Sequence, residues 1–419
     1  MDDNRFRMDV SERDKIIFVA RQPIFDRNLE VFGYELLFRS GATARAGKII
    51  DPVRASLDVL ANSFLVFGLE RLTGGKKAFV NFSEELLLKD IPLLVPPSVL
   101  VIELLETINI SEELLKKCKF LRQKGYLLAL DDFAEGRRLE PLIPLVDFIK
   151  VDFLATSPEK IKAIPQKYAR FEVKFLAEKV EDENQFQLAL KSGYHYFQGY
   201  FFSRPSIFSS KPVSGLKQNI LRVFKCVTSP DCTLERLENV LKCDLELVYA
   251  LLNYINSAFF ALPNKVSSVR QALVLLGKEG VIKWVSLILV SSLAKNRPAE
   301  LIILSLFRAR FLELMAQNAG LRGVESYFLL GLLSLLDVLL GRPFSELTKE
   351  LPISQELKEA LEGKPNIFRQ ALDLCMAYER GRWEALFELK RPFPVSLERL
   401  NQIYLEALNW ADKLFKTLV

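Results

Sequence analysis

The stretch Tyr126-Leu-Leu-Ala-Leu-Asp-Asp-Phe133 decides the fold of the first half of the chain. Its apolar residues follow one another without polar alternation, which predicts a strand buried on both faces, as in a parallel sheet or a barrel. The strand runs directly into two adjacent carboxylates, Asp131 and Asp132. These acids repel each other unless a positive group lies beside them. A solvated loop that begins with two aspartates is the alternative for this stretch taken alone.

Short apolar runs alternate with helical patterns along the first half of the chain. Strands are expected at 16–20, 31–38, 78–82, 99–105, 126–130, 148–153, 173–177 and 194–200. Repeated strand–helix units indicate a parallel α/β sheet, and their number favours a closed, TIM-like (β/α) barrel. Helical spacing then continues to the end of the chain. We therefore expect a flexible N-terminus at 1–14, a barrel at 15–206, a linker at 207–215 and an all-α domain at 216–419.

Polar side chains end the predicted strands. They are Glu35, Asn81, Glu103, Asp131, Asp132, Lys150, Glu178 and Gln198. In an α/β barrel the carboxyl ends of the strands meet at one mouth, where active sites are built. Carboxylate and amide oxygens suit Mg²⁺ or Mn²⁺, and such clusters activate water for the hydrolysis of phosphate esters. Lys150 is expected either to stabilise developing negative charge or to hold the water.

These residues lie in motifs that resemble a known family. Gly33-Tyr-Glu-Leu-Leu-Phe-Arg39 resembles the Glu-Ala-Leu signature of EAL domains, which hydrolyse or bind cyclic di-GMP. Further segments follow the family's order: Val80-Asn-Phe-Ser83, Ile102-Glu-Leu-Leu-Glu-Thr107, Asp131-Asp-Phe133, Ile149-Lys-Val-Asp152, Ala177-Glu-Lys-Val-Glu181 and Gln198-Gly-Tyr-Phe-Phe-Ser-Arg-Pro205. The resemblance covers residues 15–206 and implies a bacterial signalling protein.

The resemblance also implies a role for each site residue. It assigns the metal, Mg²⁺ or Mn²⁺, to Glu35, Asn81, Glu103 and Asp131, with Asp132 available to a second ion. Lys150 would orient the attacking water, and Glu178 would be the general base. The remaining assignments are Gln22, Arg39 and Gln198 to the dinucleotide and Glu106 to support of the adjacent loop.

Two departures from the family pattern leave the activity of the barrel open. The signature alanine is Leu36, and Ala134-Glu-Gly-Arg-Arg138 replaces the small loop Gly-Thr-Gly-Tyr-Ser of active members. A ligand displaced by about 1 Å costs orders of magnitude in rate. The barrel is therefore expected either to hydrolyse cyclic di-GMP or to act as a catalytically inactive nucleotide sensor or protein scaffold. Enolase-like proton abstraction would use similar residue types, but its motif order differs.

The second domain has helical spacing at 216–225, 234–240, 245–255, 269–276, 280–293, 301–319, 327–340 and 397–418. Two of its segments, 244–258 and 266–277, resemble HDOD domains, the all-helical relatives of metal-dependent HD phosphohydrolases. Ser334 and Leu335 follow Gly331-Leu-Leu333, where the catalytic relatives carry His-Asp. The single histidine of the chain, His195, lies in the first domain. We therefore expect a non-catalytic output module that binds a protein partner.

Composition bears on nucleic-acid binding, on the cellular compartment and on membrane insertion. A net charge of +5 on 419 residues is too small to predict nucleic-acid binding by itself. Five cysteines, an odd number without C-x-x-C spacing, suit a reducing cytoplasm. The sequence begins without a signal-peptide pattern, and its apolar runs are too short or too charged to predict a membrane span. A cytoplasmic protein is expected, and a homodimer stays open.

Overall fold

The computed structural model describes residues 17–40, 68–133, 139–203, 215–229, 231–256, 265–293, 298–351 and 353–418. The predicted flexible N-terminus at 1–14 and the altered loop at 134–138 lie outside these ranges. The predicted linker also lies outside them, except for Gly215, which begins helix α8 (Gly215–Thr228). The described residues fall into two compact units, one of residues 1–207 with 377–388 and one of residues 208–376 with 389–419.

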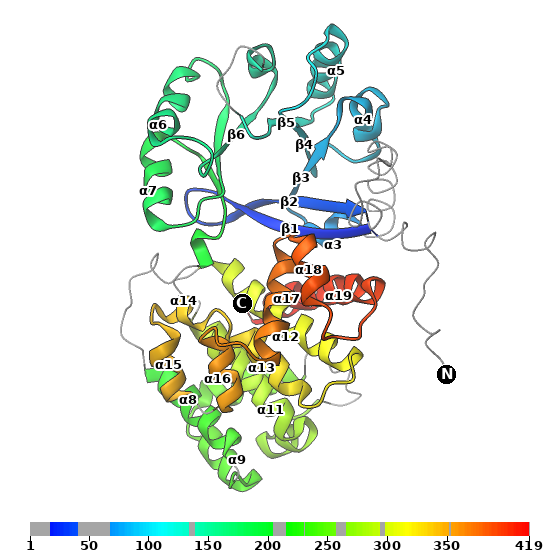
Figure 1. Ribbon diagram of the computed structural model, residues 1–419. Helices are drawn as coiled ribbons and strands as arrows, with labels where there is room; N and C mark the ends of the chain where they lie inside the picture. The colour runs from blue at the N-terminus through cyan, green and yellow to red at the C-terminus, as the bar shows by residue number, and fades with distance from the viewer. Residues whose placement is uncertain are drawn as a thin grey trace, which may run out of the picture. The chain divides into compact units, whose positions relative to one another are not determined.

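The first unit is built on a closed barrel whose strands are neighbours in chain order, as the sequence predicts (Figure 1). The strands are β1 (Ile17–Phe25), β2 (Val31–Ser40), β3 (Lys77–Phe82), β4 (Leu100–Leu104), β5 (Leu127–Leu130), β6 (Phe148–Asp152), β7 (Lys174–Glu178) and β8 (Tyr196–Gln198). Strands β2 to β8 pair in parallel. β1 runs antiparallel to both of its neighbours, because a hairpin turn joins it directly to β2.

Short helices connect the strands around the barrel, and one more, η4, follows the last strand. They are α3 (Leu69–Thr73), α4 (Glu84–Leu88), η2 (Ile91–Leu94), α5 (Glu112–Gln123), η3 (Glu140–Leu145), α6 (Pro158–Lys167), α7 (Glu183–Ser192) and η4 (Phe201–Ser203). The side chains of Ser111 and Asp182 accept hydrogen bonds from backbone N–H groups in the first turns of α5 and α7. These caps satisfy donors that a helix start leaves unpaired, and so they fix where each helix begins.

An apolar layer fills the inside of the barrel. Its members come from seven of the strands and are Ile24, Phe79, Val101, Ala129, Phe148, Leu176 and Tyr196, with Phe32 of β2 packed against them. The aromatic rings interlock, since the ring centroids of Phe79 and Phe148 lie 5.5 Å apart and those of Phe148 and Tyr196 lie 5.6 Å apart. The barrel interior is therefore a packed core on which a polar layer can stand.

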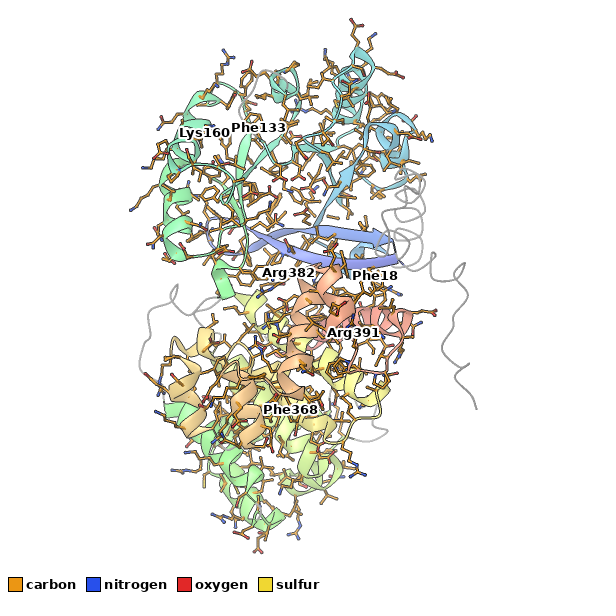
Figure 2. The ribbon with its side chains drawn as sticks, viewed as in Figure 1. Phe18, Phe133, Lys160, Phe368, Arg382 and Arg391 are labelled. Carbon is orange, nitrogen blue, oxygen red and sulfur yellow. The ribbon has the colours of Figure 1, made fainter. Side chains whose placement is uncertain are left out.

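A segment from near the C-terminus belongs to the barrel unit. Residues Ala377–Glu388 cluster with the barrel, where Phe18 of β1 packs against Tyr378, Trp383 and Phe387. Figure 2 labels Phe18 and Arg382, the residue that precedes Trp383. Phe18, Tyr378 and Trp383 are almost fully buried, so this segment extends the core of the first unit along β1.

The second unit is helical throughout its described residues. After α8 the chain forms α9 (Leu234–Lys242), α10 (Leu245–Ile255), α11 (Val269–Leu293), α12 (Ala299–Asn318), α13 (Val324–Leu333), α14 (Leu336–Leu340), α15 (Phe344–Glu350), α16 (Gln355–Leu361), α17 (Ile367–Glu379), α18 (Trp383–Leu389) and α19 (Leu397–Leu418). The end of α17 and nearly all of α18 belong to the first unit. α12 packs against both α13 and α19. No helix in the described ranges combines the length and the apolar character needed to cross a bilayer.

Candidate active site

The polar residues at the strand ends form a second layer inside the barrel, next to the apolar layer. Asn81 follows Phe79 by two residues, and the same spacing relates Glu103, Asp131, Lys150, Glu178 and Gln198 to the layer residues of their own strands. Residues two apart in a strand point to the same face, so these side chains also point inward. Gln22 precedes Ile24 by two residues because β1 runs in the opposite direction.

Lys150 lies at the centre of this polar layer and is completely buried. Its Nζ atom is 2.6 Å from Glu103 Oε1, 2.7 Å from Asp131 Oδ1 and 2.8 Å from Glu178 Oε1. Glu35 Oε2 lies 3.5 Å away. The structure therefore brings together residues from β2, β4, β6, β7 and the end of β5, as the convergence of strand ends requires.

The electrostatic balance at Lys150 is uneven, because four carboxylates surround one ammonium group. Burial alone would lower the pKa of Lys150, but its acidic neighbours outweigh burial and hold that pKa well above its usual range. Burial raises the pKa of Glu178 to about 8, and the negative charges of Asp131 and Glu35 add to this effect while Lys150 opposes it. Burial also raises the pKa of Glu103. The raised pKa values show that one ammonium group is too little positive charge for all four carboxylates to ionise, so a further cation would be favoured.

Several oxygens at the mouth have no hydrogen-bond donor within the described structure. They are Asn81 Oδ1, Glu103 Oε2, Glu178 Oε2 and Gln198 Oε1, all of them buried. A buried acceptor without a partner costs about 1–3 kcal/mol, and more when it is charged. A hard divalent cation would satisfy such oxygens, since Mg²⁺ and Mn²⁺ prefer carboxylate and amide ligands. Asn81 lies in register with Glu103 on the neighbouring strand, so both oxygens belong to one cluster. The residues present therefore fit a divalent ion.

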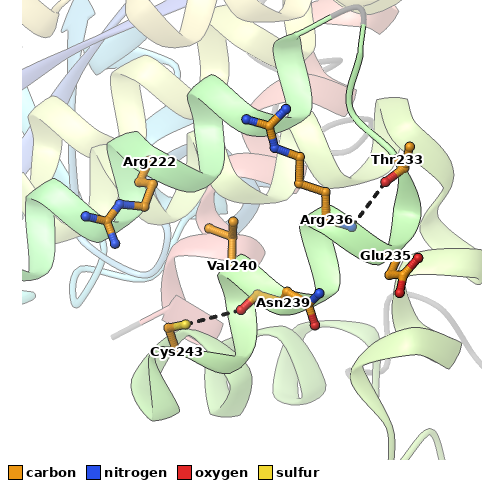
Figure 3. Close-up of a pocket in the computed structure, with 7 residues that line it drawn as sticks. All are labelled: Arg222, Thr233, Glu235, Arg236, Asn239, Val240 and Cys243. Atoms are coloured by element: carbon orange, nitrogen blue, oxygen red, sulfur yellow. Dashed lines mark hydrogen bonds between the residues drawn. The ribbon is translucent and has the colours of Figure 1, made fainter.

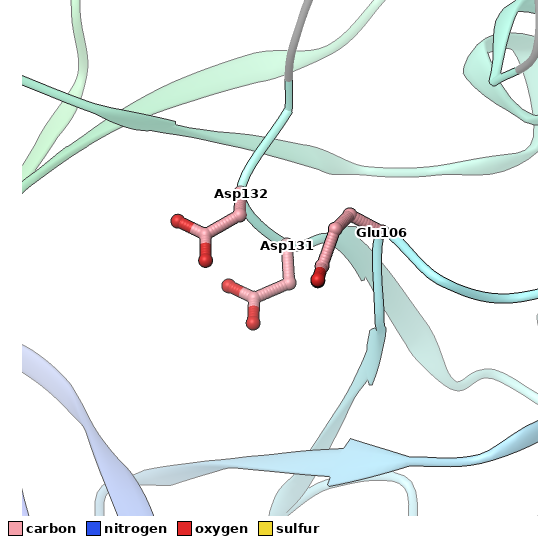
Figure 4. Close-up of side chains that lie close together, drawn as sticks. All are labelled: Glu106, Asp131 and Asp132. Carbon is pink, nitrogen blue, oxygen red and sulfur yellow. The ribbon is translucent and has the colours of Figure 1, made fainter. Parts of the chain in front are cut away.

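A second group of carboxylates lies beside the first. One oxygen each from Glu106, Asp131 and Asp132 falls within 4.8 Å of the others (Figure 4). Asp131 belongs to both groups, because its Oδ1 atom also accepts a hydrogen bond from Lys150. The sequence predicts Glu106 as support for a loop, whereas the geometry brings its carboxylate close enough to share an ion with the two aspartates.

Two residues that sequence reasoning did not assign hold Asp132 in place. Lys179 lies 3.7 Å from Asp132 Oδ1 and also forms an ion pair with Asp152. Asp152 in turn accepts hydrogen bonds from the backbone N–H groups of Leu154 and Ala155. Asp152 and Glu178 are register partners in β6 and β7, which places Lys179 next to Asp152. Lys179 and Asp152 lie in two of the motifs that resemble the EAL family. The register of β6 and β7 is the feature that could have predicted their pairing.

The glutamines form one edge of the mouth. Gln198 Nε2 donates to Glu35 Oε2 at 2.6 Å and to Gln22 Oε1 at 3.0 Å. Gly199 follows with a φ of +143°, and a Cβ atom there would lie 2.1 Å from the carbonyl oxygen of Val180. Only glycine allows this close approach of the chain, which positions Gln198. Arg39 belongs to β2, but its side chain lies outside the described part of the structure.

Comparison with known proteins now identifies the family. The EAL domain model matches residues 76–205, and the HDOD domain model matches residues 214–350. The uncharacterized protein YuxH of Bacillus subtilis is 37% identical over 407 residues, which are 95% of this chain and 98% of that protein. The chain belongs to the EAL–HDOD family.

Two further similarities accompany this assignment. Cyclic di-GMP phosphodiesterase CdgJ of Vibrio cholerae is 34% identical to this EAL–HDOD protein over 398 residues, covering 94% of the chain and 92% of CdgJ. The crystal structure of Bacillus subtilis YkuI, an EAL-domain protein in complex with its substrate c-di-GMP and calcium, is 22% identical. It has a TM-score of 0.39 and covers 65% of this chain and 76% of YkuI.

Ser334 of the HDOD domain lies apart from any cluster of possible metal ligands among the described residues. Ser334 Oγ donates to the carbonyl oxygen of Gly331 at 2.7 Å and accepts from Arg308 Nη1 at 3.2 Å. In the described part of this domain, no three acidic, cysteine or histidine side chains lie close enough together to hold an ion. Burial raises the pKa of nearby Asp337 to about 6. The hydrogen bond from Arg308 thus links α12 to the residue that follows α13.

Proposed function

We propose that the EAL barrel hydrolyses cyclic di-GMP to the linear dinucleotide in a reaction that depends on Mg²⁺ or Mn²⁺. The observation that carries this proposal is the carboxylate cluster around Lys150, together with its unpartnered buried oxygens. The printed name of the relative CdgJ, a cyclic di-GMP phosphodiesterase, supports the same substrate. A metal-free site of this kind would hold surplus negative charge for no gain in stability.

In this proposal the ion is held by Glu35, Asn81, Glu103 and Asp131. A second ion would use Asp132 and Glu106 with the shared Asp131. When bound, such ions lower the pKa of a water molecule and neutralise charge on the phosphoryl oxygens. The sequence motifs and the donor chemistry support this assignment equally.

The chain's own residues then act on water and on the leaving group. Glu178 takes a proton from the attacking water, because its carboxylate lies in the cluster around Lys150 and its buried Oε2 atom has no donor in the described structure. Lys150 orients the water and stabilises negative charge on the phosphate. Glu103, Asp131 and Glu178 occupy its three N–H donors in this structure, so one of these contacts must give way to the water. The bond from water oxygen to phosphorus forms, the bond from phosphorus to the 3′ oxygen breaks, and that oxygen takes up a proton.

Recognition of the nucleotide is assigned to the edge of the mouth. Gln22 and Gln198 present amide groups beside Glu35, and Arg39 is proposed to contact the phosphates. The HDOD domain is proposed as a non-catalytic output module that binds a protein partner, because Ser334 and Leu335 replace the catalytic His-Asp pair. Binding of cyclic di-GMP without turnover remains the alternative, and the substituted segment Ala134-Glu-Gly-Arg-Arg138 favours it.

The first prediction concerns Asp131, which both carboxylate groups share. Asp131→Asn keeps the shape of the side chain but removes a negative charge, so the affinity for Mn²⁺ should fall at least ~10-fold. Isothermal titration calorimetry of the full chain measures this affinity. Asp90→Asn is the matched control, because Asp90 lies outside the mouth and pairs with Lys117. Equal affinity in the parent and in Asp131→Asn would remove Asp131 from the metal site.

The second prediction is that the barrel binds metal and the HDOD domain does not. The full chain carrying both Glu35→Gln and Asp131→Asn should retain no stoichiometric transition metal, because only the barrel offers a suitable cluster among the described residues. Elemental analysis after dialysis against Mn²⁺ checks this. One full equivalent of metal left in the double variant would show that the HDOD domain holds an ion of its own.

A further inference from the structure

The helical unit contains a pocket of about 190 Å³, which we call the α11–α12 pocket. Its walls come from α10, α11, α12, α13 and α19. Leu287 and Phe328, which are buried, form its apolar wall. Lys283, Arg310 and Glu313 bring charge to the same space. A cavity that combines an apolar wall with a few convergent polar groups is the usual form of a small-molecule site.

The charges in the α11–α12 pocket leave a positive excess. Glu313 is 3% exposed and forms ion pairs with both Lys283 and Arg310. Two cations therefore share one carboxylate, and the side chains of both cations remain 29% exposed. Each cation also faces a ring, since Lys283 Nζ lies 5.3 Å from the centre of Phe328 and Arg310 Cζ lies 5.9 Å from that of Trp410. One further negative charge would balance the group.

The volume of the pocket limits what can fill it. A network that only joined helices would be packed without such a hollow, because protein interiors are close-packed. A cavity of about 150 Å³ is enough to hold benzene, so 190 Å³ accommodates a compact ring system but not a cyclic dinucleotide. A monoanion fits the charge, whereas a phosphate dianion would leave the pocket negative.

The larger hollow between α8 and α9 offers a useful contrast (Figure 3). Its volume is about 460 Å³, and its polar lining residues, including Arg222, Arg236 and Cys243, are exposed. Figure 3 shows the two arginines on separate helices. A shallow surface of this kind has no fixed charge arrangement. The α11–α12 pocket, by comparison, holds its cations on a buried carboxylate.

We propose that the α11–α12 pocket binds a small organic carboxylate with a flat apolar body. The carboxylate would lie between Lys283 and Arg310, and the apolar body would lie against Leu287 and Phe328. Burial raises the pKa of Tyr254 to about 12, with Glu313 adding to the effect, so its hydroxyl stays protonated in the wall. This site is separate from the proposed barrel chemistry and does not depend on it.

The test uses the full chain and 2-naphthoate as the probe in isothermal titration calorimetry. Binding with 1:1 stoichiometry and a Kd of about 1 mM or tighter is expected for a ligand of this size. The uncharged analogue 2-naphthalenemethanol should bind at least ~10-fold more weakly, because it lacks the charge-assisted hydrogen bonds. Inorganic phosphate should bind more weakly too, since it lacks the apolar body.

Variants locate the binding. Leu275→Trp places a large ring at the half-exposed wall of the pocket without changing its charges, and it should abolish 2-naphthoate binding. Val274→Trp is the matched control, because Val274 is the exposed neighbour on α11 and does not line the pocket. Lys283→Gln should weaken binding by ~10–100-fold. A thermal melt of each variant checks that it has folded.

Three results would overturn the proposal. Absence of 2-naphthoate binding at 10-fold above the expected Kd would show that the pocket takes no such anion. Equal binding by Leu275→Trp and Val274→Trp would place the ligand elsewhere. Equal affinity for 2-naphthoate and its alcohol would remove Lys283 and Arg310 from recognition. The Asp131→Asn variant should bind 2-naphthoate like the parent, which keeps this test apart from that of the barrel.

Discussion

Glu178→Gln is expected to lower the rate of cyclic di-GMP hydrolysis by ~10²–10⁴-fold, the range that a positioned general base contributes. Glutamine has nearly the same shape as glutamate, but its amide cannot take a proton from water. The nucleotide should still bind, because Gln22, Gln198 and the metal ligands remain in place. Chromatography of the linear product under saturating Mn²⁺ measures the rate, and calorimetry measures the binding.

Glu172→Gln is the matched control for this change. Glu172 is an exposed residue that precedes the same strand, β7, at the end opposite the mouth. Its replacement should leave the rate unchanged. A rate in Glu178→Gln within ~3-fold of the parent would assign the general base to another residue, since the smallest contribution of a base is about 10²-fold. Loss of nucleotide binding would instead make Glu178 part of the recognition surface.

Lys150→Met is expected to cause the largest loss of stability. Methionine fills the space of the lysine stem but leaves the buried Glu103 and Glu178, and the partly buried Asp131, without their shared cation. Removing one partner of a buried ion pair costs about 3–5 kcal/mol. Urea unfolding in EDTA should show a decrease of this size in the free energy of unfolding. Added Mn²⁺ should restore part of it, because the metal supplies positive charge to the same oxygens.

Lys179→Met provides the comparison at a half-exposed ion pair. Lys179 pairs with Asp152, and its side chain is 51% exposed, so its replacement should cost about 0–1 kcal/mol. Equal stability losses in Lys150→Met and Lys179→Met would show that the buried cluster does not depend on the lysine. A loss in Lys150→Met that Mn²⁺ leaves untouched would separate the metal from these carboxylates.

The barrel and most of its polar layer could be predicted because their pattern is local. Each strand-end residue follows an apolar run. Because alternate residues of a strand point to the same face, the inward-facing residues can be identified from the sequence alone. The sequence predicts that the first strand ends at residue 20, but β1 continues to Phe25 through Arg21 and Pro23. Arg21 is buried there because its Nη1 atom donates to the carbonyl oxygen of Leu72 at 2.7 Å, a contact far along the chain.

Contacts between residues far apart in the sequence also explain why the observed helices of the second unit differ from the predicted ones. The sequence predicts one helix at 327–340, whereas α13 and α14 are separate helices that meet at Ser334 and Leu335. Gly331 approaches α12 so closely that a Cβ atom would lie 2.4 Å from the Arg308 backbone, and this fixes where α13 lies. The place of Ala377–Glu388 in the barrel unit depends on contacts with Phe18 that no periodic pattern records.

One measurement tests the central claim directly. Purified full-length protein is incubated with cyclic di-GMP and Mn²⁺ or Mg²⁺, and both nucleotide binding and the linear dinucleotide are followed over time. The account predicts binding and steady formation of the linear product, which stops when EDTA removes the metal. Binding without any product would contradict the proposed hydrolysis and leave a nucleotide sensor. Absence of both binding and product would show that the barrel neither binds nor hydrolyses cyclic di-GMP.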